Sequence, residues 1–469
     1  MDFKRKAYDE LKEWKSRKNH KPIIVKGLRQ VGKSFIVSKF AKENYRHVVI
    51  FDFRHQPILR NCFLNGYDVD TIITLSKLYL PESDYVPHQT AIIFEEINDC
   101  EEARTSLKAF ALDGRYDVLA TGSLLGINHY RNERRTAIPT GYEEYLEMSS
   151  LDFEEFLWAM NTPGDAIDTI KKSLVTMEEV SAPYHEYFKE MIIRYIAVGG
   201  MPDAIRAFLE NRNDYLEARK VQQRLLADYR GDFGRYLSED GEEKIDYRLQ
   251  MKLNQLMDTI PSQLSKERES VRFRFSEIGS GARYSQYIDA IDWLYQAGLV
   301  LPVYNTNAME SPLEANRMDS SFKLFLSDIG LLMAAFPLST LQELINRNLG
   351  SRKGAIYENL SATMIHKAGF PLYYYGNQKK HLEIDFLLET VGGITLLEEK
   401  STNGKMAASK AVMEGRTPFH ACQCVKIIKD GIGKGSFYTS YPQYLEPFYL
   451  QKEKKELESG LHAKEVTLN

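Results

Sequence analysis

The residues with the clearest chemical meaning form one run near the N-terminus, Gly27-Leu28-Arg29-Gln30-Val31-Gly32-Lys33-Ser34. This run fits the phosphate-binding loop pattern G-x-x-x-x-G-K-[S/T] at every fixed position. A short apolar run precedes it and a helical apolar pattern follows it, which is the strand–loop–helix context that the pattern requires. Backbone N–H groups of the run and the helix N-terminus would face the phosphates of a nucleoside triphosphate. Lys33 would reach the β- and γ-phosphates, and the hydroxyl of Ser34 would bind Mg²⁺.

A second chemical signal is a pair of carboxylates, Glu95 and Glu96, which end the apolar run 91–96. The run resembles a Walker B segment, in which the first carboxylate orients a Mg²⁺-bound water and the second polarises the attacking water. The usual first residue is Asp, so Glu95 is one methylene longer, and position errors of about 1 Å can cost about 10²-fold in rate. We therefore expect Glu95 to bind the metal weakly or indirectly and Glu96 to act as the catalytic carboxylate.

A third polar cluster, Thr121-Gly122-Ser123, ends the apolar run 117–123. Ligands of parallel sheets bind at the carboxyl ends of the strands, which is where this cluster and the two carboxylates fall. The hydroxyl of Thr121 can hydrogen-bond a γ-phosphate or an attacking water, and a plain turn after a buried strand explains the residues equally well. A loop with three arginines follows at 131–135 and is expected to be solvated surface.

The elements that must position these groups alternate between short apolar strands and helical patterns, which is typical of a parallel α/β sheet. We predict a P-loop nucleoside-triphosphatase domain over 1–185, with strands near 22–25, 47–53, 91–96 and 117–123.

The middle of the chain, 186–335, predicts helices followed by a winged-helix-like segment. Apolar residues recur at helical spacing over 186–260, and the run 199–202 (Gly-Gly-Met-Pro) interrupts that pattern. The glycine pair would let a backbone approach either a nucleotide or another helix. A short helix starting at 275–278, a second helix over 285–294 and a wing strand over 299–304 would form the segment. DNA reading and a scaffold or lid role both stay open for it.

The C-terminal part, 336–450, carries another candidate site. Glu398 and Lys400 are two residues apart on a predicted strand, so their side chains share a face. Asp385, at the end of a neighbouring strand, can join them around one Mg²⁺ ion, whose preferred ligands are carboxylates and water. Lys400 would then orient or deprotonate the attacking water. Taken alone, these residues also fit an ordinary solvent-facing strand end.

The predicted order of elements here, α-β-β-β-α-β, resembles the restriction-endonuclease-like fold. Nucleases of that fold carry an Asp, then Glu-x-Lys on the next strand, and often a helix Glu; the counterparts are Asp385, Glu398 and Lys400, with Glu358 on the helix. The resemblance implies a Mg²⁺ site formed by Glu358, Asp385 and Glu398, with Glu398 and Lys400 acting in catalysis on DNA or RNA. The fold also serves as a nucleic-acid-binding scaffold, so a binding role without cleavage stays open.

The order of motifs along the chain resembles a prokaryotic family of AAA-type ATP-binding proteins whose C-terminal domain is restriction-endonuclease-like (PD-(D/E)xK) and of unknown function. The matching stretches are 27–34, 93–97, 119–123, 150–157, 199–202 and 325–332. The resemblance covers nearly the whole chain and implies ATP and Mg²⁺ as ligands. It places Thr121 where AAA-type ATPases carry a sensor for the γ-phosphate. Glu95 is the main departure from the family pattern.

Length and composition set the remaining bounds. The chain has 469 residues, enough for about three domains, and its 61 basic and 65 acidic residues give a net charge of −4. No global field therefore indicates a nucleic-acid partner, although a local basic surface stays compatible with one. The four cysteines lack metal-site or disulfide spacing, and neither a membrane span nor a signal peptide is recognised, so a cytoplasmic protein is expected. The charged tail 451–469 is expected to be a solvated helix.

The sequence thus predicts an α/β protein that binds and hydrolyses ATP and carries a nuclease-like domain. One alternative is ATP-gated cleavage of DNA or RNA; another is a slow ATP-dependent switch with an inactive nuclease-like domain. No membrane partner is expected, and the sequence leaves oligomerisation open.

Overall fold

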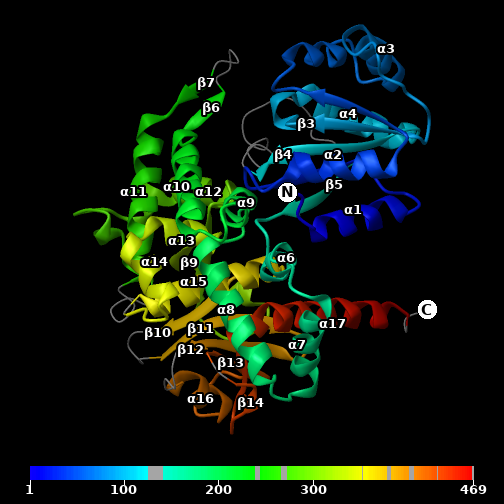
Figure 1. The fold of residues 1–469 in the computed structure, drawn as a ribbon. Helices are drawn as coiled ribbons and strands as arrows, with labels where there is room; N and C mark the ends of the chain where they lie inside the picture. The colour runs from blue at the N-terminus through cyan, green and yellow to red at the C-terminus, as the bar shows by residue number, and fades with distance from the viewer. Residues whose placement is uncertain are drawn as a thin grey trace. The chain divides into compact units, whose positions relative to one another are not determined.

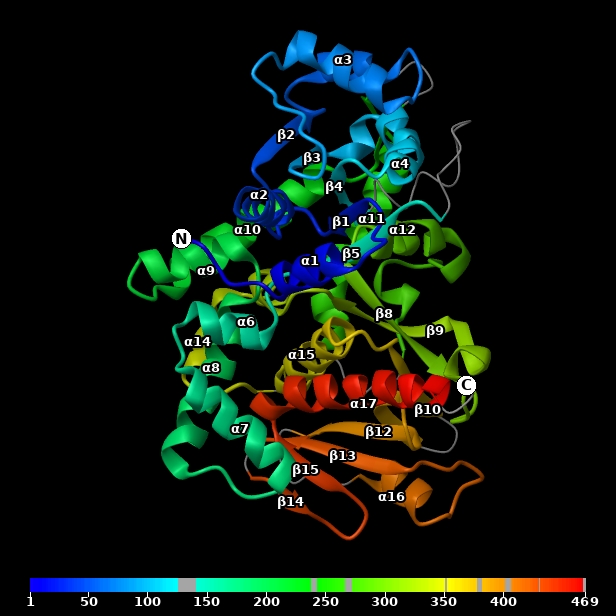
Figure 2. The ribbon, with the colours of Figure 1, turned by 90° about the vertical axis from the view of Figure 1, so that its right-hand side faces the viewer.

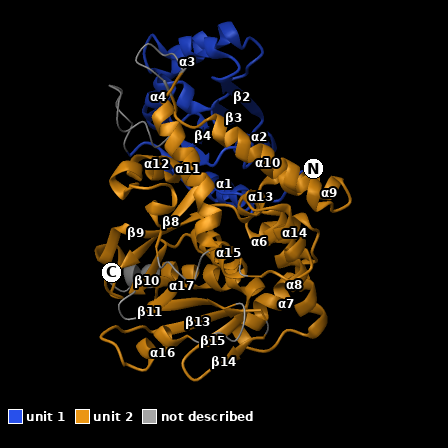
Figure 3. Cartoon of the chain, turned by 90° about the vertical axis from the view of Figure 1, so that its left-hand side faces the viewer, with its two compact units in different colours: residues 1–151, 296–298 blue, residues 152–295, 299–469 orange. Residues whose placement is uncertain are grey.

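A computed structural model describes residues 1–124, 141–237, 243–265, 272–350, 352–377, 382–400, 406–429 and 431–466 (Figure 1). The chain forms two compact units, one of Met1–Leu151 with Gln296–Gly298 and the other of Asp152–Tyr295 with Leu299–Asn469 (Figure 3). The first division of the chain thus falls inside the stretch 1–185. The boundaries expected at 335 and 450 stay predictions.

The first unit contains a five-stranded sheet in which every neighbouring pair is parallel, in the order β2-β3-β4-β1-β5. Its strands are β1 (Ile23–Gly27), β2 (His47–Asp52), β3 (Thr90–Glu95), β4 (Asp117–Ser123) and β5 (Glu144–Met148). The predicted parallel α/β sheet is therefore confirmed. Because all strands run the same way, the P-loop, the two carboxylates and the Thr121 cluster lie along one edge of the sheet.

Helices cover both faces of this sheet, which is why its inner strands β3, β4 and β1 are almost entirely buried (Figure 2). On one side α2 (Lys33–Asn44) packs on the strands and α1 (Lys6–Ser16) packs on α2. The other side holds α3 (Val69–Tyr79), α4 (Glu101–Asp113) and the 3₁₀ turns η1 (Pro57–Phe63) and η2 (Ile97–Asp99). Aromatic rings fill that layer; for example, Phe51 and Phe94 meet edge to face with ring centroids 5.4 Å apart.

The second unit begins with helices, which confirms the expected helical middle. They are α6 (Phe153–Ala159), α7 (Gly164–Thr176), α8 (Ala182–Val198), α9 (Pro202–Glu210), α10 (Tyr215–Gly231), α11 (Tyr247–Leu264) and α12 (Tyr284–Gln296). A small hairpin, β6 (Arg235–Leu237) and β7 (Glu243–Ile245), lies between α10 and α11. Among the described residues, no helix is both long and apolar enough to span a membrane.

An eight-stranded mixed sheet forms the rest of the second unit, in the order β14-β15-β13-β12-β11-β10-β8-β9. Its strands are β8 (Val300–Thr306), β9 (Arg317–Leu326), β10 (Tyr373–Asn377), β11 (Leu382–Thr390), β12 (Gly393–Lys400), β13 (Gln423–Ile428), β14 (Gly433–Lys434) and β15 (Thr439–Pro442). The remaining elements are α13 (Ile329–Ala335), α14 (Leu338–Ile345), α15 (Lys353–Lys367), α16 (Ala407–Met413), the turn η6 (Gln443–Leu445) and α17 (Glu446–Val466). The predicted α-β-β-β-α-β order corresponds to α15, β10, β11, β12, α16 and β13.

Two elements of the middle region differ from the winged-helix prediction. Residues 275–277 form only a 3₁₀ turn, although α12 is present where the second helix was expected. The expected wing strand is β8, which pairs antiparallel with β9 and parallel with β10 inside the large sheet. Its residues are almost all buried, because it is an inner strand of that sheet rather than part of an exposed hairpin.

The Gly199-Gly200 pair marks a close contact between helices rather than a nucleotide site. Asp328 is fully buried, and its carboxylate accepts hydrogen bonds from the backbone N–H groups of Gly200 (2.9 Å), Gly330 (2.9 Å) and Leu331 (3.2 Å). A Cβ at Gly199, whose φ is +73°, would lie 2.4 Å from Asp328 Oδ1 and 2.7 Å from Gly330 Cα. Asp328 therefore caps α13 and joins it to the end of α8.

We expect Asp328→Ala to destabilise the second unit by about 3 kcal/mol, because three buried N–H groups lose a charged acceptor. Urea denaturation of the full chain, followed by tyrosine and tryptophan fluorescence, measures the change. Asp319→Ala, on the exposed part of β9, is the matched control and should change stability by less than about 1 kcal/mol. Equal stability of the two variants would contradict the capping role.

Candidate functional site

The P-loop connects β1 to α2 at the carboxyl edge of the parallel sheet. Gly27 pairs with Met148 of β5, and a Cβ there would lie 2.1 Å from the Met148 carbonyl oxygen, so only glycine fits. Gly32 has φ +94°, a left-handed conformation that glycine adopts without strain, and it precedes the first residue of α2. Gln30 is also left-handed, with φ 65°. The loop thus has the tight, glycine-dependent course that a phosphate cradle needs.

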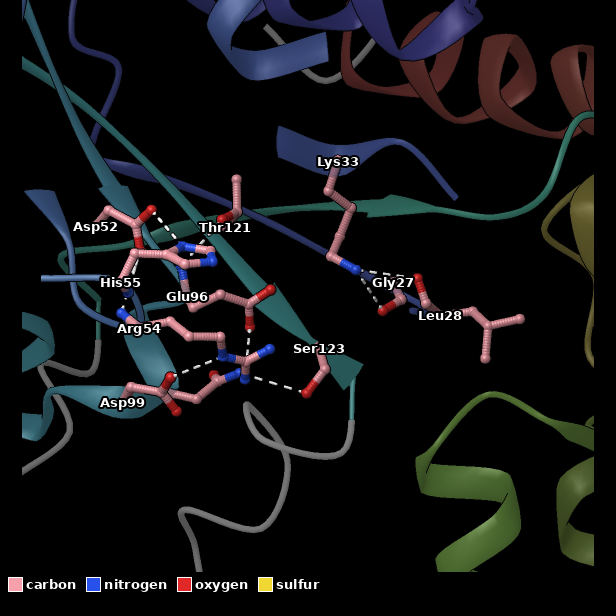
Figure 4. A network of polar contacts seen from close by, with 11 residues as sticks. Gly27, Leu28, Lys33, Asp52, Arg54, His55, Glu96, Asp99, Thr121 and Ser123 are labelled. Atoms are coloured by element: carbon pink, nitrogen blue, oxygen red, sulfur yellow. Dashed lines mark hydrogen bonds and ion pairs between the residues drawn. The ribbon is translucent and has the colours of Figure 1, made fainter. Parts of the chain in front are cut away.

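The Lys33 side chain lies inside this loop and is only 6% exposed. Its ammonium group donates hydrogen bonds to the carbonyl oxygens of Gly27 (3.1 Å) and Leu28 (2.9 Å) (Figure 4). Burial lowers the pKa of Lys33 to about 8; the positive charges of Arg29 and Arg54 lower it as well, and the negative charge of Glu96 opposes them. Ser34 follows in the first turn of α2 and is half-buried.

The loop is also held from outside by a residue that the sequence did not single out. Arg5 is buried, and its guanidinium donates to the carbonyl oxygens of Val31 (2.9 Å) and Ser149 (2.6 Å). It therefore ties the P-loop to the segment that follows β5. No spacing rule reveals a contact between residues 26 and 144 positions apart in the sequence.

The two carboxylates at the end of β3 differ in backbone conformation and in their contacts. Glu95 is the last residue of β3, half-buried, in register with Asp52 of β2. Glu96 follows in a left-handed conformation with φ 51° and ψ 56°, which is uncommon outside glycine and turns its side chain out of the strand pattern. The hydroxyl of Thr121, which is fully buried, accepts a hydrogen bond of 3.1 Å from the Glu96 backbone N–H. Thr121 thus positions Glu96; direct contact with a γ-phosphate stays a prediction.

An arginine from the neighbouring strand end engages the Glu96 carboxylate. Arg54, two residues beyond β2, lies 3.6 Å from Glu96 and donates a hydrogen bond of 3.2 Å to Asp99 (Figure 4). Its own backbone N–H is fixed by Asp52, whose Oδ1 accepts it at 3.1 Å. The arrangement holds a cation and a carboxylate together at the edge of the sheet where the phosphates would bind. The loop arginines at 131–135 lie outside the described residues.

The C-terminal site brings three of its four predicted residues together. Lys400 Nζ lies 2.8 Å from Asp385 Oδ2 and 2.7 Å from Glu398 Oε2. Asp385 also accepts the backbone N–H of Glu399 at 2.8 Å, and Glu398 accepts a hydrogen bond from the Ser409 hydroxyl on α16. Glu398 is 1% exposed, so the strand end is not the solvent-facing one that the alternative reading requires.

Burial and pairing set the protonation of this cluster. Burial raises the pKa of Glu398 to about 7, helped by the negative charge of Asp385 and opposed by Lys400. Burial opposes the charge of Lys400 as well, but Asp385 and Glu398 outweigh it and raise the Lys400 pKa above its usual range. Lys400 is therefore a cation here, suited to orienting a water or neutralising charge, and in this state it is not the base that the sequence offered as one option.

Glu358 has a different partner. It is buried on α15 and forms an ion pair with Lys323 of β9, which also contacts Glu383 at 3.0 Å. Lys323 was not predicted from the sequence, although a lysine between the buried Phe322 and Leu324 of a strand is an unusual residue that indicates a buried partner. The predicted three-carboxylate set is thus split between two lysines.

The metal sites can be tested against these donors. Across the described ranges, no three Asp, Glu, His or Cys side chains are grouped as ligands of one metal ion. Magnesium needs only one or two protein carboxylates, since waters and phosphates complete its shell. Ser34 with Glu95 suits that requirement at the P-loop, and Asp385 with Glu398 suits it at the C-terminal site, where Lys400 lies between the carboxylates. The full set with Glu358 is not assembled.

The residue between Glu398 and Lys400 lies on the other face of β12. Glu399 is half-buried there, with Glu446 of α17 nearby, and the Ser361 hydroxyl contacts both carboxyl groups at 3.1 and 2.9 Å. Burial and the proximity of Glu446 raise the pKa of Glu399 well above its usual range. This second acidic pair is separate from the Lys400 cluster, although one strand carries both.

Comparison with protein families places the site in a known context. Residues 19–157 match the family model described as an AAA domain. Over these residues the N-terminal segment is similar to an AAA domain. Residues 189–342 and 353–430 match two further models, each described only as a domain of unknown function (DUF8612 and DUF4143). None of these models covers half of the chain. A nuclease family is not among the matches.

Solved structures match the chain only at low similarity. The Aeropyrum pernix ORC2 protein, in ADPNP and ADP complexes, is 14% identical with a TM-score of 0.34, and the match covers 73% of this chain and 92% of that one. The Thermotoga maritima RuvB Holliday junction branch migration motor is 10% identical with a TM-score of 0.28, over 67% and 92% of the two chains. Likeness at this level carries no argument about activity. Among curated proteins, no significant match is found.

Proposed function

We propose that the first unit binds ATP with Mg²⁺ and hydrolyses it. The observation that carries this proposal is the Lys33 ammonium group, buried inside a glycine-shaped loop where its hydrogen bonds go to backbone carbonyl oxygens. A buried cation held in this way gains strongly from a nearby anion. The AAA-type domain and the strand-end positions of Glu95, Glu96 and Thr121 support a nucleoside triphosphate as that anion.

Each residue of the loop and the strand ends has a role in this proposal. Backbone N–H groups of residues 27–34 surround the phosphates, and Lys33 swings from the carbonyls to the β- and γ-phosphates. Ser34 and Glu95 would hold Mg²⁺, which supplies charge neutralisation at the phosphates when bound. Glu96, fixed through its backbone by Thr121, orients and polarises the attacking water. Arg54 must release Glu96 for that step.

Lys33→Ala should weaken ATP binding about 30-fold or more, because a charge-assisted contact to phosphate is lost. Glu96→Gln should keep ATP affinity and lower turnover by about 10²-fold or more. Calorimetric titration with Mg·ATP and a phosphate-release assay measure the two effects. Lys42→Ala, an exposed lysine of the same helix α2, is the control and should behave like the natural chain.

Full affinity and turnover in the Lys33→Ala variant would refute the proposal. Tight ATP binding by the natural chain with negligible turnover would instead favour the alternative function, a slow ATP-dependent switch, for which the longer side chain of Glu95 is the physical reason. Both functions, ATP hydrolysis and the slow switch, fit a cytoplasmic protein. In the cytoplasm ATP and Mg²⁺ are present and the four free cysteines stay reduced.

The lowered pKa of Lys33 predicts that ATP binding weakens at alkaline pH. Phosphate binding needs the protonated lysine, and the free protein loses that proton as pH rises through about 8. The dissociation constant for Mg·ATP should therefore rise above pH 8, by up to about tenfold per pH unit. In Lys33→Arg the guanidinium stays charged, so its dissociation constant should be constant from pH 7.5 to about 9.5. A flat profile for the natural chain would contradict the assignment.

A second candidate function, metal-dependent cleavage of DNA or RNA, belongs to the Lys400 cluster. The specific observation in its favour is that Lys400 lies within 2.8 Å of both Asp385 and Glu398, the residues at which nuclease-like chemistry would occur. Mg²⁺ held by the two carboxylates would supply Lewis-acid stabilisation of the phosphodiester. Lys400 would orient the water as a cation. A nucleic-acid-binding domain without cleavage is the alternative.

Glu398→Gln should lower any cleavage of single- or double-stranded substrates in Mg²⁺ or Mn²⁺ by about 10²-fold or more, because the buried carboxylate is lost. Gel analysis of labelled DNA and RNA, with and without ATP, measures the effect. Glu389→Gln, at the far end of β11, serves as the control and should cleave normally. If natural and Glu398→Gln chains are equally inactive on every substrate, the domain is a binding module at most.

A further inference from the structure

A pocket of about 120 Å³ opens within the second unit, on the face of the large sheet opposite Glu398 and Lys400. Its walls come from α8, the end of α14 and the segment after it, the start of α15, the ends of β12 and β13, and η6 (the helices and strands are labelled in Figure 2). Among these walls only Glu399 belongs to strand β12, and its side chain faces away from the Lys400 cluster. The pocket is thus distinct from both sites described above.

Positive charge dominates the lining. Lys189, Arg347, Lys353 and Lys429 line the pocket, against Glu399 as its one acidic residue. They come from three separate parts of the chain, so no local sequence run produces the cluster. Lys429 is exposed at the end of β13, and Lys353 is half-buried at the start of α15. Cations gathered around a concave, partly desolvated space attract an anion more strongly than the same charges on a flat surface.

Arg347 is held in place before any ligand arrives. Its guanidinium contacts Glu186 at 3.3 Å and Glu190 at 3.1 Å, two acids one turn apart on α8. Its backbone is left-handed, with φ 56°, which is uncommon for a residue with a side chain and indicates that the surroundings fix it. Lys189, on the same helix, contacts Glu186 at 2.8 Å. A fixed guanidinium loses less entropy when it binds an anion.

The rest of the lining suits a flat ring. Tyr357 and Tyr444 line the pocket together with four aliphatic side chains, those of Ile192, Ile193, Leu344 and Leu349. Tyr444 is buried and fixed by a hydrogen bond of 2.9 Å between its hydroxyl and His185 Nδ1. Tyr357 is only half-buried, so its ring can stack on a nucleobase, and the exposed Asn348 supplies polar groups that can read a base edge.

We propose that this pocket binds a nucleoside monophosphate, with its phosphate at Lys353, Lys429 and Arg347 and its base against the tyrosine wall. A cationic rim beside an aromatic wall matches the two halves of that ligand. The inference is independent of ATP binding at the P-loop. It adds a ligand site next to β12, the strand that carries Glu398 and Lys400.

Calorimetric titration of the full chain with AMP tests the proposal, in the natural chain and in Lys33→Ala, which silences the P-loop. Both should bind AMP with similar, saturable affinity. Lys353→Ala combined with Lys429→Ala should weaken that binding at least about tenfold. The double control Lys410→Ala with Lys434→Ala removes two exposed lysines elsewhere in the unit and should bind normally.

Titrations with three further compounds distinguish between the possible ligands. Inorganic phosphate and adenosine should each bind at least about tenfold more weakly than AMP, since each makes half of the contacts. A 5′-phosphorylated oligonucleotide that binds as tightly as AMP would identify a strand end as the source of the same nucleotide. Loss of AMP binding in Lys33→Ala, insensitivity to the Lys353 and Lys429 substitutions, or phosphate binding equal to AMP binding would each overturn the proposal.

Discussion

A buried ammonium group is the constraint on which the first unit depends. Removing the charge of Lys33 from water costs free energy, and the carbonyl dipoles of Gly27 and Leu28 return only part of it. The nearby guanidinium groups of Arg29 and Arg54 add to the cost, as the lowered pKa of Lys33 records. An anion bound in the loop would offset this cost, and the sheet, Gly27 and Arg5 hold the loop in a defined conformation.

Two half-buried lysines of the second unit are paired differently. Carboxylates from neighbouring strands and helices match them: Glu358 and Glu383 match Lys323, and Asp385 and Glu398 match Lys400. Each of these lysines has its charge balanced by carboxylates of the protein, so no ligand is needed to stabilise it. A metal ion at the Lys400 cluster would have to share Asp385 and Glu398 with a resident cation.

Features that depend on residues close together in the sequence could be predicted well. The P-loop of 27–34 and the parallel strands follow from short patterns whose geometry is determined by adjacent residues, and the structure confirms the sheet. The grouping of Asp385 with Glu398 and Lys400 followed from strand periodicity. Contacts across many residues were not recoverable: Arg5 on Val31, Arg54 on Glu96, and Lys323 on Glu358 join side chains that no spacing rule connects. The strand β8 was expected at nearly the right residues but as part of a wing. Its place inside the large sheet depends on pairing with β9 and with β10, which follows about 70 residues later, and local patterns do not reveal such pairing.

The alternation of side chains along β12 has an evolutionary consequence. Glu398 and Lys400 face α16, and Glu399 between them faces α15 and α17. Inserting or deleting one residue within Gly393–Lys400, ahead of Glu398, would exchange the two faces, placing Glu399 beside Asp385 and Ser409, and Glu398 and Lys400 beside Ser361 and Glu446. Related chains can therefore vary in the loops around this strand but must conserve its length, so an alignment gap inside it marks a protein that has lost both arrangements at once.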